Sequence, residues 1–184
     1  MHNIDSFIKE SQRLHPSGNS EYCIWPSCMW PVLIIYLVTS SRLAQQDFTF
    51  SDGTRVPKGT AMSVYISPTH LDETIYEDPL KFDGFRFVKM KESQHQDGSN
   101  AAGDSSGKRF DIVTLSVNFQ SFGYGRHACP GRFFIANEMK LMLAHIVLTY
   151  EVKLETEGIH PPDVWMVTAR IPNTTANVLF RKRM

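Results

Sequence analysis

The pattern of apolar and polar residues predicts two helices at opposite ends of this chain. Near the amino terminus, apolar residues recur at helical spacing from Ile4 to Leu14 and leave a charged face. The pair His15-Pro16 that follows is a typical stop signal. Further along, from Phe133 to Leu148, apolar residues are so frequent that we expect a long helix buried on most of its sides.

Short segments between and after these helices predict strands. Residues 47–50 are followed by the turn signature Ser51-Asp52-Gly53-Thr54, and residues 61–67 alternate as a half-buried strand should. Residues 150–154 and 176–179 predict a closing pair of strands. These helices and strands agree with an α+β, mainly helical fold class, with residues 1–184 forming part of one domain.

Two segments carry no regular pattern. Residues 89–108 are polar and rich in small residues, which predicts a flexible surface loop. Residues 19–39 have no capping signal and no period, and we interpret them as an aberrant insertion such as a retained intron. The apolar run from Trp30 to Val38 within them is shorter than the ~20 residues that cross a bilayer.

Composition is that of an ordinary globular protein and narrows the function only by exclusion. The 184 residues are 42% hydrophobic and 21% charged, with a formal net charge of zero. This neutrality argues against a nucleic-acid partner. Three cysteines, an odd number, argue against a disulfide framework, and Cys23 and Cys28 lack the spacing of a zinc site.

A loop broken by glycines, residues 122–131, carries Cys129 to the start of the second helix. Gly123 and Gly125 permit the positive φ angles of a tight turn, and Pro130 suits the first position of a helix. The unpaired N–H groups at a helix start favour the thiolate, which is the form of cysteine that binds metal. The alternative is a buried, idle cysteine, the commoner case for a lone cysteine.

The loop pattern F-x-x-G-x-[RH]-x-C-x-G resembles the haem-ligand loop of the cytochrome P450 family, the haem-thiolate monooxygenases. The resemblance implies that Cys129 is the axial ligand of the iron of haem b. It also implies that His127 and Arg42 contact the haem propionates and that Phe122 packs beside the sulfur. The cofactor-binding residues carried over in this way are Arg42, Phe122, Gly125, His127 and Gly131.

A second part of the resemblance concerns the amino-terminal helix. Glu10 and Arg13 stand three residues apart, so their side chains can meet on one helix face. Residues 82–87 resemble the family segment whose arginine completes a buried Glu-Arg-Arg network, which would add Arg86 and shield the charges with Phe82, Phe85 and Phe87. The implied role is structural. By contrast, we interpret His70 as a loop histidine.

The resemblance implies a C-terminal portion of a cytochrome P450 of the filamentous-fungal type. The intact enzyme would insert one oxygen atom of O₂ into a small apolar substrate, in secondary metabolism, with electrons from NADPH through a reductase. Intact relatives are anchored in the endoplasmic reticulum membrane, and we expect neither that anchor nor independent activity in this chain. The alternatives are a non-catalytic haem-binding protein and a plain α+β interaction module.

Overall fold

The computed structural model describes residues 2–16, 38–96, 110–159, 161–162, 164–166, 169–171 and 173–184. The helices are α1 (His2–Leu14), α2 (Ser67–His70), α3 (Arg86–Gln96) and α4 (Arg132–Thr149), with a 3₁₀ turn η2 (Gly125–His127) before α4. The strands are β1 (Val38–Leu43), β2 (Phe48–Thr49), β3 (Arg55–Val56), β4 (Ala61–Tyr65), β5 (Tyr150–Leu154), β6 (Val164–Met166), β7 (Ala169–Ile171) and β8 (Val178–Lys182).

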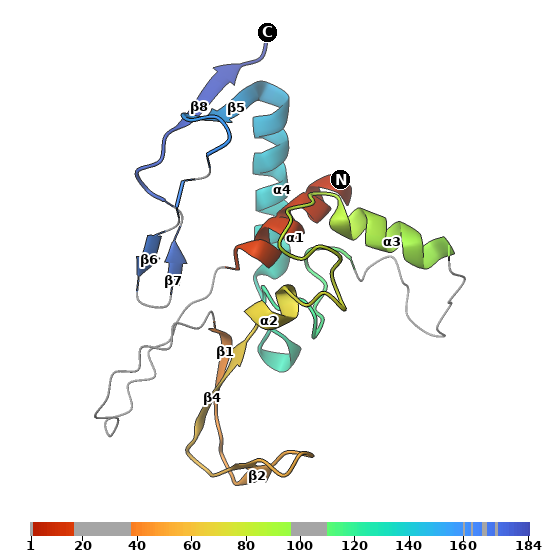
Figure 1. The fold of residues 1–184 in the computed structure, drawn as a ribbon, viewed down its shortest axis with the longest axis vertical. Coiled ribbons are helices and arrows are strands. Elements are labelled where there is room, and N and C mark those ends of the chain that lie inside the picture. Colours follow the sequence, from red (N-terminus) through yellow and green to blue (C-terminus); the bar gives the residue numbers. More distant parts are fainter. Residues whose placement is uncertain are drawn as a thin grey trace.

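Helix α1 lies among the other helices and contacts both α3 and α4 (Figure 1). The sequence predicted this helix and its charged face, and the family resemblance predicted burial of Glu10 and Arg13 on that face, but nothing predicted burial of Lys9. Its charged side faces inward, with Lys9, Glu10 and Arg13 no more than 2% exposed, whereas Phe7 is 43% exposed. Burial of such charges is stable only when each one is paired or hydrogen-bonded, and these are.

Two small apolar clusters pack the helices against the segment of residues 110–122. One consists of Ile8, Ile112 and Ala136 and joins α1 to α4 and to the segment of residues 110–122. The other consists of Tyr76, Phe87 and Phe119 and joins α3 to the same segment. Residues 110–122 therefore contribute to both clusters, through Ile112 and Phe119, before the chain enters the cysteine loop.

The described strands form four two-stranded antiparallel sheets, β1–β4, β2–β3, β5–β8 and β6–β7. The predicted strands near residues 48, 61 and 150 are present, but β4 ends at Tyr65 and is mostly exposed instead of half-buried. Ser67 and Pro68 already belong to α2, because proline suits a helix start. The closing pair joins Tyr150 to Lys182, so β8 lies further along than residues 176–179.

The prediction of a flexible loop at residues 89–108 is wrong at its beginning. Helix α3 continues to Gln96 because Phe87, 3% exposed, anchors its first turn in the second cluster, and Lys, Met, Glu and Gln favour helix. Residues 97–109 lie outside the described residues. Most of the predicted insertion at residues 19–39 likewise lies outside the described residues. Its last two residues, Val38 and Thr39, belong to β1, where Val38 pairs with Tyr65.

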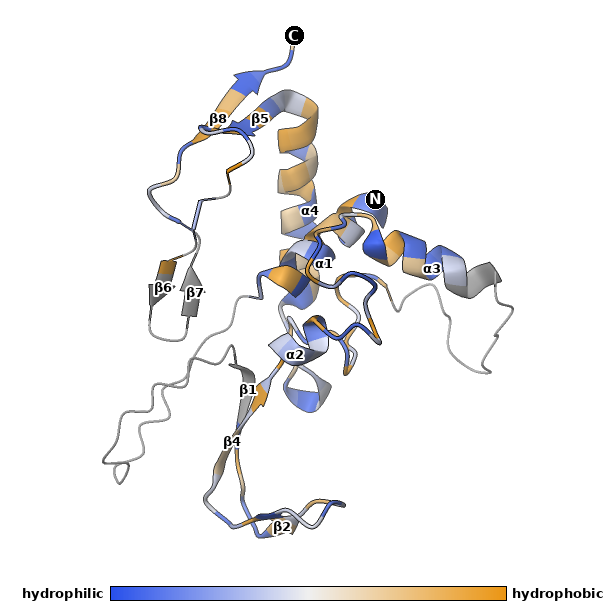
Figure 2. Cartoon of the chain, in the orientation of Figure 1, coloured by the Kyte–Doolittle hydropathy of each residue, from blue (hydrophilic) through white to orange (hydrophobic). Residues whose placement is uncertain are grey.

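Helix α4 is present as predicted, but it is not buried on most of its sides. Only Ala136 on it is fully buried, whereas Phe134 is 70% exposed, Leu141 63% and Leu148 77%. In Figure 2 much of α4 has the orange of hydrophobic residues, and the exposed ones give the helix an apolar surface. Among the described residues, no helix is long and apolar enough to cross a membrane.

We expect this surface on α4 to make the isolated chain self-associate and to bind an apolar fluorescent dye. Changing both Leu141→Gln and Leu148→Gln should lower dye fluorescence several-fold and shift the chain toward monomer in size-exclusion chromatography. Both side chains are exposed, so each change should alter the free energy of unfolding by no more than about 0.5 kcal/mol. Unchanged dye binding in the double variant would show that another surface is responsible.

Candidate functional site

The cysteine loop is closed by its own backbone. The amide of Cys129 donates to the carbonyl of Phe122 at 2.8 Å, and the amide of Gly123 donates to that of Gln120 at 2.8 Å. Gly123 and Gly125 have φ angles of 74° and 69°, the left-handed region that the sequence predicted for these glycines. The two ends of the loop are thereby held together, and the position of Cys129 is fixed relative to Phe122.

Cys129 lies just before α4, and the helix starts later than predicted. Its first residue is Arg132, with Gly131 at the N-cap, so Pro130 is outside the helix instead of at its first position. The Arg132 guanidinium donates from Nη1 to the carbonyl of Cys129 at 3.1 Å and from Nε to that of Val113 at 3.2 Å. Both peptide groups of Cys129 are thus bonded.

The thiol of Cys129 is free and half-buried. A Cβ built on Gly131 would lie 3.9 Å from its Sγ, an ordinary van der Waals distance. Glycine at this position therefore keeps one side of the sulfur clear.

The other residues predicted to bind a cofactor come from three parts of the chain. The Phe122 ring packs against the cluster of Ile8, Ile112 and Ala136. His127 is exposed in η2, next to the equally exposed Gly125. Arg42 is exposed in β1, opposite Met62 of β4. Both basic residues are thus at the surface.

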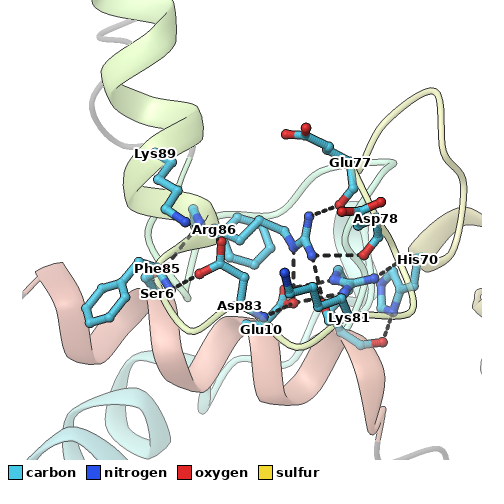
Figure 3. Close-up of polar contacts among 12 residues, drawn as sticks. Ser6, Glu10, His70, Glu77, Asp78, Lys81, Asp83, Phe85, Arg86 and Lys89 are labelled. Carbon is cyan, nitrogen blue, oxygen red and sulfur yellow. Dashed lines mark hydrogen bonds and ion pairs between the residues drawn. The ribbon is translucent and has the colours of Figure 1, made fainter.

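Glu10, Arg13 and Arg86 are brought together in a buried network (Figure 3). Arg13 donates to both carboxylate oxygens of Glu10, from Nε at 2.8 Å and from Nη2 at 2.9 Å. Arg86 Nε donates to Glu10 Oε1 at 3.0 Å, and the amide of Asp83 donates to the same oxygen at 3.1 Å. The carboxylate is therefore bound by groups from α1, α3 and the turn before α3.

Arg86 also binds the backbone of the preceding turn. Its guanidinium donates to the carbonyls of Lys81 at 2.8 Å and Asp78 at 3.2 Å, and makes a further bond to that of Glu77. Asp78 has a φ of 44°, so this arginine stabilises a turn with a left-handed residue. The network fixes the path of residues 77–86 as well as the charges.

The electrostatics of Glu10 favour its ionised form. Burial alone would raise the pKa of this carboxyl, but the hydrogen bonds from Arg13, the Asp83 amide and Arg86 outweigh burial and hold the pKa below its usual value. The predicted aromatic shield is only partly present. Phe87 is buried, but Phe82 and Phe85 are 44% and 54% exposed.

His70 belongs to the same network, although its sequence context indicated a loop histidine. The side chain is fully buried, its Nδ1 lies 3.1 Å from the carbonyl oxygen of Arg13, and Arg13 Nη1 donates to the His70 carbonyl at 2.6 Å. Since a carbonyl only accepts, Nδ1 carries the proton. Burial is the main cause that lowers the pKa of His70 to about 4. The positive charge of Arg13 acts in the same direction, whereas the hydrogen bond to the Arg13 carbonyl opposes the decrease in pKa.

A cluster of His2, Asp5 and Asp111 has the residue types of a metal site, with potential ligand atoms within 4.8 Å of one another. Its carboxylates already face ammonium groups. Lys140 Nζ lies 2.6 Å from Asp5 Oδ1, and Lys9 is attracted by both Asp111 and Asp5. Because the two negative charges are balanced by two positive ones, we assign no metal ion to this cluster.

The geometry defines a half-buried thiol in a closed glycine loop and, separately, a buried Glu-Arg-Arg network that joins α1 to α3. Comparison with known proteins shows the family to which the chain belongs. The sequence model of the family Cytochrome P450 matches residues 34–179, and this chain belongs to that family. The family predicted from the sequence is confirmed.

The relatives are fungal, again as predicted. The chain is similar to Cytochrome P450 monooxygenase 151 of Postia placenta, with 40% identity over 183 residues that cover 100% of this chain and 31% of the relative. It is 33% identical to Cytochrome P450 monooxygenase CYP512U6 of Ganoderma lucidum over 183 residues, 100% of this chain and 30% of the relative. The chain thus spans about a third of the length of these curated relatives.

Solved structures support the fold. Retinoic acid bound cyanobacterial CYP120A1 matches with a TM-score of 0.65 and 24% identity, over 100% of this chain and 34% of that chain. The cytochrome P450DA heme domain matches with a TM-score of 0.62 and 19% identity, over 98% of this chain and 31% of that chain. The predicted α+β cytochrome P450 fold is therefore confirmed.

Proposed function

We propose that this chain binds haem b through the thiolate of Cys129 and serves an enzyme that inserts one oxygen atom of O₂ into a small apolar substrate. The observation that carries the proposal is the free, half-buried thiol of Cys129, whose own backbone amide and carbonyl are both hydrogen-bonded. A sulfur placed in this way is oriented before any ligand arrives.

The residues present suit haem as a ligand. A thiolate is a soft donor that binds iron, and the exposed His127 and Arg42 offer two basic groups for the haem carboxylates. When bound, haem supplies the oxygen and redox chemistry. The residues of this chain would hold it: the Cys129 sulfur would bind the iron, Gly125 and Gly131 would allow close approach of the backbone, and Phe122 would pack at the start of the loop.

Within this proposal, Glu10, Arg13 and Arg86 act as a scaffold. Their contacts join α1, α3 and the turn before α3, while α1 also contacts α4 directly behind the loop. Electrons from NADPH through a reductase, a small apolar substrate and a role in secondary metabolism are proposed for the whole enzyme. The similarity to fungal cytochrome P450 monooxygenases supports these assignments.

Reconstitution with haem tests the proposal. The reduced, carbon monoxide-bound protein should show the red-shifted Soret band of thiolate ligation, and Cys129→Ala should abolish it. Cys23→Ala and Cys28→Ala are the matched controls, which should keep the band. A band that persists in Cys129→Ala, or that never forms in the unaltered chain, would contradict the proposal.

Turnover separates an enzyme from a protein that only binds haem. A thiolate-ligated preparation should be assayed with a reductase, NADPH and apolar substrates. Oxygenated product supports the monooxygenase assignment. Ligation without product would favour the non-catalytic haem-binding alternative for the chain assayed.

A further inference from the structure

Lys9 is a buried cation where three segments meet. Its side chain belongs to α1 and is 2% exposed. Its Nζ lies 4.6 Å from the centre of the Phe87 ring of α3 and 4.8 Å from that of the Phe119 ring. It also donates to the carbonyl of Asp111 at 3.4 Å. Asp111 and Phe119 both belong to residues 110–122, which lead into the cysteine loop.

The ammonium group keeps its charge in this position at neutral pH. Burial lowers the pKa of Lys9 to about 8, and the carboxylates of Asp111 and Asp5 limit that decrease. Two aromatic faces and a carbonyl take the place of the water that the cation loses on burial. The contact is therefore one between a charged group and the segment it touches, not apolar packing alone.

Phe119 lies three residues before the start of the cysteine loop. Its ring is stacked on that of His70, with centroids 5.3 Å apart, and its amide donates to the carbonyl of Ser116 at 3.3 Å. Three residues later, the carbonyl of Phe122 accepts the amide of Cys129 at 2.8 Å. A shift of the Phe119 ring would therefore move the acceptor that fixes the Cys129 peptide.

We propose that Lys9 is a positioning residue, whose cation holds Asp111 and Phe119 and thereby keeps the Phe122–Cys129 hydrogen bond in place. This proposal depends on the proposed function only for its purpose, because the positioned thiolate matters if Cys129 binds haem. The positioning itself is a property of the protein without haem. It can therefore be measured separately.

Amide hydrogen exchange of the full chain without haem tests this role. Lys9→Met keeps the length of the side chain and removes the charge. The amides of Phe119 and Cys129 should then exchange about 10-fold faster, because their segment opens more often. The amide of Ile135, bonded to Gly131 at 3.0 Å within α4, should be unchanged. Lys9→Arg, which keeps the charge, should restore slow exchange at Cys129.

Phe119→Leu gives an independent measurement, since it removes an aromatic face and leaves the ammonium group. It should also speed exchange at Cys129. The double variant of Lys9→Met and Phe119→Leu should exchange little faster than the faster single variant, because both changes remove the same contact between the ammonium group and the ring. Equal acceleration at Cys129 and Ile135 would show a general loss of stability and overturn the proposal. So would slow exchange at Cys129 in Lys9→Met. Failure of haem ligation in the unaltered chain would contradict the proposed function and leave this result intact.

Discussion

Glu10→Gln is expected to lower the free energy of unfolding by about 3–5 kcal/mol, because it leaves two buried guanidinium groups without their carboxylate. Glu10 is fully buried, and its two oxygens accept from Arg13, Arg86 and the Asp83 amide. Glutamine has nearly the same shape, but it carries no charge, and an NH₂ group that can only donate replaces one of the two accepting oxygens. Denaturant unfolding followed by far-ultraviolet circular dichroism measures the change.

Glu151→Gln is the matched control, because Glu151 pairs with Arg181 in the β5–β8 sheet at the surface. The side chains of this pair are 47% and 81% exposed, so water replaces the lost contact. The effect should be several-fold smaller than that of Glu10→Gln. Equal effects of the two changes would show that the buried network does not stabilise the fold more than a surface pair does.

The features that the sequence predicted well depend on neighbours close in the chain. Gly123 and Gly125 adopt positive φ angles because glycine alone does so without a steric penalty. Glu10 and Arg13 meet because three residues separate them on one helix. Arg86 was placed with them by family resemblance alone, since 76 residues separate it from Glu10.

The features that were missed depend on distant partners. Periodicity indicated a charged face on α1 but not the burial of Lys9, whose ammonium group lies over the Phe119 ring, 110 residues further along the chain. His70 is buried by a contact with Arg13, 57 residues away. Helix α4 has an apolar pattern that indicates burial, and yet what covers a helix is decided by the surfaces packed on it, not by its own sequence.

Acid is expected to destabilise the protein through His70. Its pKa is lowered from 6.5 to about 4 in the folded state, so the unfolded chain binds the proton more tightly. The stability due to neutral His70 is thus fully present above about pH 6.5 and is lost as the pH falls toward 4. The loss should reach about 3 kcal/mol, since each unit of pKa difference corresponds to about 1.4 kcal/mol.

His70→Asn isolates this contribution, because the asparagine amide can donate to the Arg13 carbonyl in place of Nδ1 but does not titrate. Denaturant unfolding of both proteins should be measured from pH 8 to pH 4. The free energy difference between them should stay constant above about pH 6.5 and then change by about 3 kcal/mol in disfavour of the unaltered protein. Titration of Glu10 is common to both proteins and cancels in this difference. A difference that does not vary with pH would mean that His70 binds a proton in the folded protein as easily as in the unfolded chain. The hydrogen bonds between His70 and Arg13 would then tolerate a charged imidazolium.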